Sequence, residues 1–152
     1  MTCKPLFIVD GDNVMGEMEN NFIIEKLLSL LSAISPLGDI IVIVSAATRH
    51  RIDDVHEYRK LLRSRAIFQA PAGIDEDAYI LEIASETGGI VVSNDRFREY
   101  EHLYREVIAK KLTFMIIPHN NEWKTFLPWK KSFSPGKRAM ENGVSSGVKI
   151  DC

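Results

Sequence analysis

The sequence predicts a three-layer α/β/α domain with a central parallel sheet of about five strands. Two observations support this prediction. Along the chain, short continuous apolar runs, typical of strands, alternate with longer stretches in which apolar residues recur at helical spacing. The short runs are apolar throughout and do not alternate with polar residues, which indicates strands buried on both faces, as parallel strands covered by helices are.

The first half of the chain provides three predicted strands and two predicted helices. The expected strands cover residues 5–9, 40–45 and 66–69. The helix between the first two strands begins near Phe22, and Ser35-Pro36-Leu37-Gly38 ends it. A second helix, from about Ile52, has basic residues on one face. Between the first strand and the first helix, Asp10-Gly11-Asp12-Asn13 is a cluster of turn-forming residues, which predicts a functional loop.

The second half continues the same alternation. A helix is expected between Asp75-Glu76-Asp77, with acidic side chains near its positive N-terminus, and Gly88-Gly89. A fourth strand follows at residues 90–93, and a polar helical stretch spans about 96–111. The fifth strand is expected at 112–117, ended by Pro118. The aromatic residues Trp123, Phe126 and Trp129 then favour packing of the chain end onto the core over stacking on bases.

Composition sets the domain organisation. The chain has 152 residues, of which 45% are apolar and 26% charged, enough for one globular domain with a core. We expect this domain to span residues 1–129 and a flexible basic tail to span 130–152. The part up to Trp129 carries 14 Lys and Arg against 19 Asp and Glu, a net charge of −5, so overall charge does not favour nucleic-acid binding. Any such role must therefore depend on a local site.

The cysteines and the hydropathy indicate in which cellular compartment the protein occurs. Cys3 and Cys152 stand at opposite ends of the chain, so there is no CxxC pair for a zinc ribbon or a redox centre. The longest apolar stretch, residues 40–47, is far shorter than the roughly 20 residues of a membrane helix, and because residues 1–5 leave no room for an apolar signal region, we expect no signal peptide. These features predict an intracellular, cytoplasmic protein with no membrane partner.

Carboxylates gather at the predicted carboxyl edge of the sheet, where ligands bind in open α/β folds. Asp10 and Asp12 follow the first strand, Asp95 follows the fourth, and Asp75 to Asp77 open a helix. Asp75 equally suits capping of that helix. Several unpaired carboxylates repel one another, so such a cluster needs protons or a divalent cation. Ligands that are oxygen atoms only favour Mg²⁺ or Mn²⁺ over zinc.

The motifs at these strand ends resemble a known family. Phe7-Ile8-Val9-Asp10-Gly11-Asp12-Asn13, together with Asp77 at a helix start and Ile90-Val91-Val92-Ser93-Asn94-Asp95, is similar to the NYN branch of the PIN-like nucleases. Within that branch the chain most resembles the Regnase-type endoribonuclease domain. The nuclease domain of proteinaceous RNase P is a more distant relative. The resemblance covers roughly residues 5 to 118 and implies a PIN-like, Rossmann-like fold.

The resemblance also implies an activity and a set of site residues. It implies a Mg²⁺- or Mn²⁺-dependent endoribonuclease in which Asp10, Asp77 and Asp95 bind the metal, Asn13 is the polar partner of Asp10, and Glu99 is an outer acidic ligand. The family further implies self-association into a homo-oligomer. This chain departs from the family at Asp12, where relatives commonly have a small hydroxyl residue, and at Glu76, where they often have aspartate.

We expect the substrate to be single-stranded RNA, because its flexible backbone enters a cleft that a duplex cannot. Six basic side chains are candidates for holding its phosphates, although nearby acidic residues make a solvent-facing or ion-paired role the more common one for any single arginine. They are Arg49, Arg51, Arg59, Arg63, Arg96 and Arg98.

Two alternative functions remain open at this point. A phosphatase of the haloacid-dehalogenase type also begins with an apolar strand and Asp-x-Asp, which Asp10 and Asp12 would supply, and Ser45 ends the second strand as its second motif requires. The usual hydroxyl residue after Asp-x-Asp is missing, however, and Asp75 to Asp77 would have no role. The other alternative is a non-catalytic RNA-binding domain with the same fold.

Overall fold

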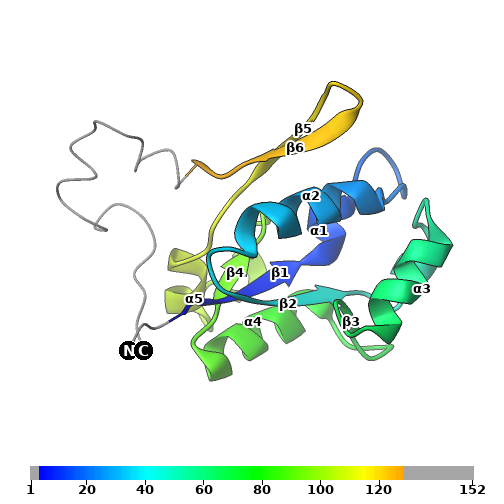
Figure 1. The fold of residues 1–152 in the computed structure, drawn as a ribbon. Helices are drawn as coiled ribbons and strands as arrows, with labels where there is room; N and C mark the ends of the chain where they lie inside the picture. Colours follow the sequence, from blue (N-terminus) through cyan, green and yellow to red (C-terminus); the bar gives the residue numbers. More distant parts are fainter. Residues whose placement is uncertain (1–3, 129–152) are drawn as a thin grey trace, which may run out of the picture.

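A computed structural model describes residues 4–128. Its central sheet has four parallel strands, β1 (Leu6–Asp10), β2 (Asp39–Val44), β3 (Phe68–Gln69) and β4 (Ile90–Val92), in the order β3-β2-β1-β4. β1 lies in the interior of the sheet and pairs with β2 on one side and β4 on the other (Figure 1). Because all strands are parallel, their carboxyl ends meet at one edge of the sheet.

Helices cover both faces of the sheet and produce the predicted three layers (Figure 1). Apolar side chains of α1 (Gly11–Met15), α2 (Ile24–Ile34) and α3 (Val55–Arg63) belong to one core cluster. Those of α4 (Glu76–Thr87) and α5 (Arg105–Ala109) belong to the cluster on the other face. No helix within residues 4–128 is long and apolar enough to cross a membrane.

The strand β1 explains why the predicted strands are apolar throughout. Phe7 and Val9 belong to the cluster that includes α2, while Ile8, between them, packs in the cluster of Ile80 and Leu81 from α4. None of the three strand residues is more than 1% exposed. Successive residues of a strand point to opposite faces, so a strand covered on both sides must be apolar at every position.

The local helix signals are confirmed. Asp75 is the N-cap of α4, and its Oδ1 accepts a hydrogen bond of 3.0 Å from the Asp77 N–H. The same helix ends at Gly88, which has a φ of +73° in the left-handed region that glycine tolerates best. Asp54, which the sequence analysis does not single out, also caps a helix: its Oδ1 accepts a hydrogen bond of 3.0 Å from the Glu57 N–H at the start of α3.

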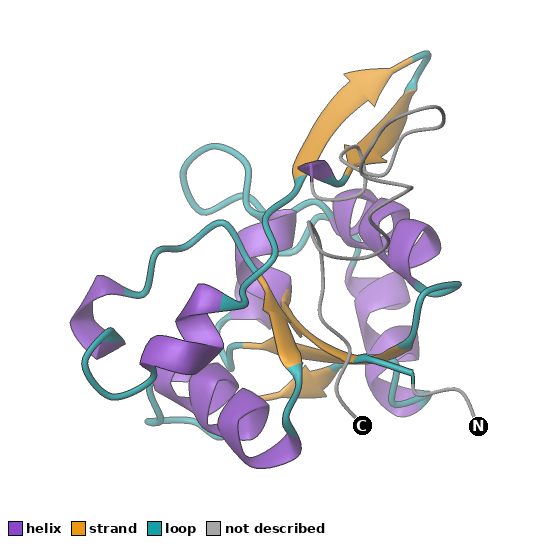
Figure 2. Ribbon diagram, turned by 90° about the vertical axis from the view of Figure 1, so that its left-hand side faces the viewer, coloured by secondary structure: helices purple, strands orange, loops and turns teal. Residues whose placement is uncertain are grey.

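The prediction of a fifth parallel strand at residues 112–117 is wrong. Only Leu112 makes a parallel bridge to Val92, after which the chain leaves the sheet. Residues Met115–His119 instead form β5, which pairs antiparallel with β6 (Glu122–Phe126) in a separate hairpin beside α2 (Figure 2). The two turn residues, Asn120 and Asn121, both have positive φ, as a tight hairpin turn requires.

The hairpin packs on the body of the domain as the aromatic residues predict. Ser29 Oγ of α2 donates to the Trp123 carbonyl oxygen at 3.0 Å, and the Lys26 ammonium lies 5.4 Å from the centre of the Trp123 ring. Trp129 and the predicted basic tail, 130–152, lie outside the described residues.

The predicted helical stretch over 96–111 is present only as short pieces. A 3₁₀ turn, η2 (Arg98–Tyr100), and the helix α5 are separated by a segment without regular structure. Phe97, immediately before η2, has a φ of +50°, and its side chain is only 2% exposed. A positive φ interrupts a right-handed helix, so the buried Phe97 ring fixes a turn where the polar sequence predicts a continuous helix.

The predicted loop after β1 is partly the short helix α1, and Gly11 begins it. A Cβ atom at Gly11 would lie 2.7 Å from Val44 Cγ1 and 2.9 Å from the Ile43 carbonyl oxygen. Its φ is not positive, so glycine is needed here because α1 approaches β2 closely, not because of a turn conformation.

We expect Gly11→Ala to lower the free energy of unfolding by about 1–3 kcal/mol, because one methyl group must displace the backbone of β2 or of α1. Urea denaturation measures the loss. Gly16→Ala is the matched control, since the nearest atom to its Cβ would be the Asp12 carbonyl oxygen at 3.2 Å. Equal losses in the two variants would show that the close approach of α1 to β2 is not the cause.

Candidate functional site

Three elements bring the predicted aspartates to the carboxyl edge of the sheet. Asp10 ends β1, Asp77 lies in the first turn of α4, and Asp95 lies in the loop after β4. The negative charge of Asp95 raises the pKa of Asp77, and the negative charge of Asp77 raises the pKa of Asp10. The structure therefore gathers the three carboxylates that the sequence places at this edge.

Asp10 is the innermost of these carboxylates, with 3% of its surface exposed. Its Oδ1 accepts a bond of 3.4 Å from the Asn13 N–H, and its Oδ2 accepts one of 2.8 Å from Ser93 Oγ. Burial is the main cause that raises its pKa to about 7, and the bond from Ser93 acts in the opposite direction. A carboxyl group whose pKa is near 7 loses its proton readily when a cation lies nearby.

Ser93 connects two of the aspartates. It is fully buried, and besides donating to Asp10 its Oγ accepts a hydrogen bond of 3.0 Å from the Asp95 N–H. The Asp95 Oδ1 in turn accepts from the Phe97 N–H at 2.8 Å. A single hydroxyl thus fixes the loop after β4 relative to β1.

Asn13 holds the same loop from the other side. Its Oδ1 accepts a hydrogen bond of 2.8 Å from the Asn94 N–H. The Asn94 amide makes two bonds to the backbone of Phe114, donating to its carbonyl oxygen and accepting from its N–H, each at 3.0 Å. The structure therefore shows Asn13 as a group that positions the Asp95 loop, in addition to its backbone bond to Asp10.

The two positions at which the chain departs from the family lie together. Asp12 Oδ1 accepts a bond of 2.5 Å from Thr48 Oγ1, and Asp12 Oδ2 accepts from the Ser45 N–H at 3.3 Å. Burial, the charges of Asp12 and Asp10, and a hydrogen bond with Asp12 raise the pKa of Glu76 to about 10. Glu76 is therefore protonated at neutral pH unless a cation compensates its charge.

Asp77 and Glu99 border a cavity of about 340 Å³ at the outer side of this cluster. Burial is the main cause that raises the pKa of the half-buried Asp77 to about 6, and the charges of Asp95, Asp75 and Glu99 add to it. The exposed Glu99 lies on η2, and its neighbour Tyr100 donates a hydrogen bond to Asp75, which connects η2 to the start of α4. Arg96 and Arg98 line the same cavity.

The donor set fits a hard divalent cation. Within residues 4–128 no three His, Cys, Asp or Glu side chains form a ready-made metal cage. Mg²⁺ needs no such cage, because it keeps several waters and binds through one or two carboxylates. Every candidate ligand is a carboxylate oxygen, and Glu76 Oε1 is buried without a hydrogen-bond partner in the described part of the chain. Repulsion among these carboxylates is what a cation would relieve.

Lys111 also lies at the site, although the sequence does not identify it. Its Nζ donates to the Ser93 carbonyl oxygen at 3.0 Å, and the charges of Asp95 and Asp10 act on it. Burial, as the largest cause, lowers the pKa of its ammonium group. The only signal in the sequence is its place just before the apolar run expected at residues 112–117.

The six predicted arginines do not form one patch. Arg96 and Arg98 lie beside Asp77 and Asp95, as the sequence suggests. Arg49 and Arg59 line a second cavity, between η1 (Thr48–His50) and α3. Arg51 instead lies over the Phe22 ring, 5.8 Å from its centre, and Arg63, in the last turn of α3, lines neither cavity.

Ser93→Ala tests the connection between Asp10 and Asp95. The variant removes the hydrogen bond that lowers the pKa of Asp10, so that pKa should rise further. If Asp10 and Asp95 bind a divalent ion, metal affinity should also fall by about 10-fold to 100-fold, as it does when a group that orients a metal ligand is removed. Titration with Mn²⁺, followed by its electron paramagnetic resonance signal, measures the change. Ser85→Ala, on the solvent side of α4, is the control and should bind Mn²⁺ like the wild type. Unchanged affinity in Ser93→Ala would contradict this role of the hydroxyl.

Comparison with known proteins gives a consistent picture. A family model described as the Zc3h12a-like ribonuclease NYN domain matches residues 4–128. Two solved structures of Arabidopsis thaliana nuclear protein-only RNase P 2 superimpose with TM-scores of 0.62 and 0.59, each at 16% sequence identity. Each match covers 80% of this chain and 29% of the plant protein, so this chain corresponds to less than a third of that protein. At this identity the likeness shows a shared fold.

Proposed function

The chain belongs to the Zc3h12a-like ribonuclease NYN family, and from this premise we propose that it is an endoribonuclease that hydrolyses single-stranded RNA with the help of Mg²⁺ or Mn²⁺. The observation that carries the proposal is the gathering of Asp10, Asp77 and Asp95, with raised pKa values for the first two, at the carboxyl edge of the sheet. The fold shared with the RNase P structures is consistent with it.

In the proposed mechanism Asp10, Asp77 and Asp95 would hold the divalent ion, and Glu99 would contribute from the outer side. When bound, the ion would supply activation of a water molecule and neutralisation of the charge that develops on the scissile phosphate. Ser93 and Asn13 keep the Asp95 loop in place by their hydrogen bonds to Asp10, Asp95 and Asn94. These bonds fix the ligand positions before substrate arrives, which is how a protein reduces reorganisation during a reaction.

The arginines beside the cluster have a role in substrate binding. Arg96 and Arg98 line the cavity that also contains Asp77 and Asp95. A phosphate that approaches the carboxylates is repelled by them, and two guanidinium groups at the rim offset this repulsion through charge-assisted hydrogen bonds. We propose that they hold the RNA backbone on either side of the bond that is cut.

The test is cleavage of a 5′-labelled single-stranded RNA with Mg²⁺ or Mn²⁺, beside the same strand in a duplex and beside EDTA. We expect cutting only of the single strand and only with metal. Release of phosphate from a small phosphoester that depends on Asp12 would instead favour the phosphatase. Family membership and the use of both Asp12 carboxylate oxygens in bonds to Thr48 and Ser45 speak against that reading. RNA that is bound but left intact would show a binding domain.

A further inference from the structure

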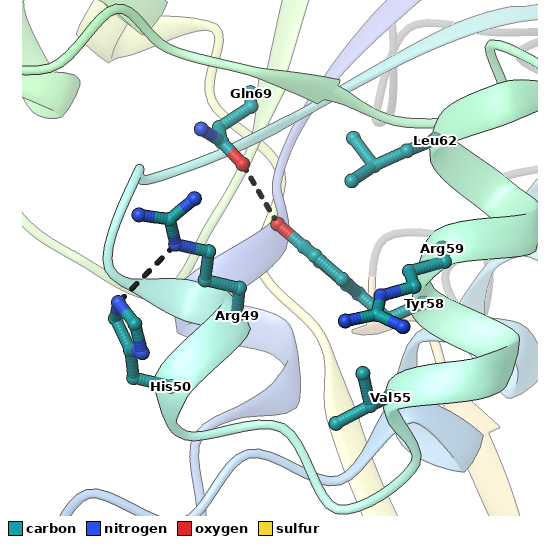
Figure 3. A pocket seen from close by; sticks show the side chains of 7 residues that line it. All are labelled: Arg49, His50, Val55, Tyr58, Arg59, Leu62 and Gln69. Atoms are coloured by element: carbon teal, nitrogen blue, oxygen red, sulfur yellow. Dashed lines mark hydrogen bonds between the residues drawn. The ribbon is translucent and has the colours of Figure 1, made fainter.

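A second cavity, of about 430 Å³, lies between η1 and α3, and one residue of β3 also lines it. Figure 3 shows its lining: Val55, Tyr58, Arg59 and Leu62 from α3 on one side, Arg49 and His50 from η1 on the other, and Gln69 of β3. Its size is within the range of pockets that bind small molecules. Neither the carboxylate cluster nor the proposed mechanism uses this cavity.

The polar part of the cavity is positive, and most of its hydrogen-bond donors are unused. The lining contains two arginines and a histidine but no acidic residue. Within residues 4–128 neither Arg49 nor Arg59 forms a salt bridge. In the same part of the chain, the two arginine side chains make one hydrogen bond, from Arg49 Nε to His50 Nε2 at 3.2 Å. The terminal amino groups of both guanidinium groups are thus available, in a fork geometry that matches a phosphate.

The rest of the cavity is apolar and fixed in shape. Val55 is 41% exposed, a large value for a valine, and Leu62 stands on the same face of α3. Behind them Tyr58 is buried, and its hydroxyl donates to Gln69 Oε1 at 3.4 Å. This bond occupies the Gln69 oxygen (Figure 3), while the Gln69 amide nitrogen makes no hydrogen bond within residues 4–128. An anion-binding end, an apolar wall and an amide suit a flat aromatic ring that carries a phosphate.

The cavity adjoins the carboxylate cluster through Asp12. Thr48, which donates to Asp12 Oδ1, immediately precedes Arg49 of the cavity wall. Gln69 pairs with Val44, and the next residue, Ser45, donates its N–H to Asp12 Oδ2. The Asp12 charge is, after burial, the next cause that raises the pKa of Tyr58, to about 12. The cavity wall and the loop that carries Asp10 and Asp12 are thus connected by direct hydrogen bonds, which places the cavity on the side of the cluster where Asp12 lies.

We propose that the cavity binds one unpaired nucleotide of the RNA, next to the position of cleavage. Its phosphate lies between Arg49 and Arg59, and its base packs against Val55 and Leu62 with its edge toward the Gln69 amide. This inference rests on the proposed function and adds a requirement to it. A base that enters the cavity cannot be paired, so the substrate must be single-stranded at this nucleotide even where its other parts are folded.

The test measures binding of a fluorescently labelled single-stranded RNA by anisotropy in EDTA, where no metal-dependent cutting occurs. One abasic nucleotide is moved along the strand in successive substrates. For the wild type we expect one position at which loss of the base weakens binding by about tenfold, since burial of a single base contributes on this order. In Val55→Ser and Gln69→Ala the intact strand should bind more weakly, and the abasic effect at that position should disappear.

Arg59→Ala and Lys60→Ala form a matched pair for the phosphate. Both remove one positive charge from exposed positions on α3, but only Arg59 lines the cavity, while Lys60 lies beside Glu57. We expect Arg59→Ala to weaken binding several-fold more than Lys60→Ala. Equal losses, together with the same abasic profile in the wild type and in Val55→Ser, would overturn the inference.

The outcome of this binding test can be distinguished from the outcome of the cleavage test of the proposed function. If RNA is cut with Mg²⁺ but these variants bind like the wild type, the endoribonuclease proposal stands and the nucleotide cavity is wrong. If no RNA is cut under any metal while the abasic position and the Arg59 effect are observed, the cavity is supported as a nucleotide site and the catalytic proposal fails.

Discussion

Asp77→Asn is expected to reduce RNA cleavage by roughly a hundredfold or more, because it removes a carboxylate that we propose as a metal ligand and not just a group that orients one. The side chain keeps its size, and the change removes one negative charge from a cluster whose charges repel one another. The variant should therefore fold at least as well as the wild type. Loss of activity would then report the site and not the stability of the domain.

Single-turnover cleavage of a labelled strand measures this effect, with circular dichroism as a check of folding. Glu82→Gln is the matched control: it also neutralises an acidic side chain of α4, but Glu82 contacts Tyr104, away from the strand ends. The control should cut at the wild-type rate. If Asp77→Asn retained more than a third of that rate, Asp77 would not be a metal ligand.

The second large effect is a loss of folding stability as pH rises, which bound metal should offset. Burial raises the pKa of folded Asp10 from 3.8 to about 7, so the folded chain binds this proton more tightly than the unfolded chain does. Without metal, stability is therefore lost as pH rises from about 4 to about 7. Each pH unit in that window costs about 1.4 kcal/mol, so ionising Asp10 costs up to about 4 kcal/mol. Asp77 and Glu76 act in the same direction, since their pKa values are also raised.

Two comparisons measure this effect by urea denaturation between pH 5 and pH 8. In EDTA, the stability of Asp10→Asn relative to the wild type should increase with pH, because the variant carries no charge to bury. At pH 8, Mg²⁺ at a hundred times its dissociation constant should stabilise the wild type by about 2.7 kcal/mol, and Asp10→Asn much less. A difference between the two proteins that is constant across this pH range would contradict the assigned pKa of Asp10.

The same raised pKa values predict the pH dependence of cleavage. In the proposed mechanism, metal binding requires the ionised forms of Asp10 and Asp77, so activity at limiting Mg²⁺ should rise with pH through about 6 to 7. Saturating Mg²⁺ should shift this rise to lower pH, because the cation favours the charged carboxylates.

The central sheet could be predicted because its signals are local. Continuous apolar strands such as Phe7-Ile8-Val9 and the capping residue Asp75 determine where strands and helices begin. The fifth strand could not be placed by the same reasoning. Whether residues 112–117 extend the sheet depends on contacts far along the chain, since the Asn94 amide binds the Phe114 backbone and the chain then turns into a hairpin. The pair Asn120-Asn121 is the one local sign of that hairpin.

The candidate site was predictable to the extent that strand ends determine it. Asp10 and Asp95 meet because parallel strands end at one edge, and Asp77 joins them because its helix starts there. The sequence does not show that Asp12 points toward Thr48 and Ser45, nor that Glu76 lies buried among charges. It also does not show that Arg51 lies over Phe22 while Arg49 and Arg59 share a cavity. Such pairings depend on side-chain directions that arise only in the folded chain.

The central proposal is that a divalent ion held by these aspartates acts on the phosphate of RNA. Its most direct test is cleavage of a strand that carries sulfur in place of one non-bridging oxygen at the scissile phosphate. With Mg²⁺, one of the two phosphorothioate isomers should be cut at least about tenfold more slowly than the normal strand, and Mn²⁺ or Cd²⁺ should restore the rate, because sulfur prefers softer metals. Equal rates with Mg²⁺ for both isomers and the normal strand, or a slow rate that no metal restores, would contradict direct contact between the metal and the phosphate.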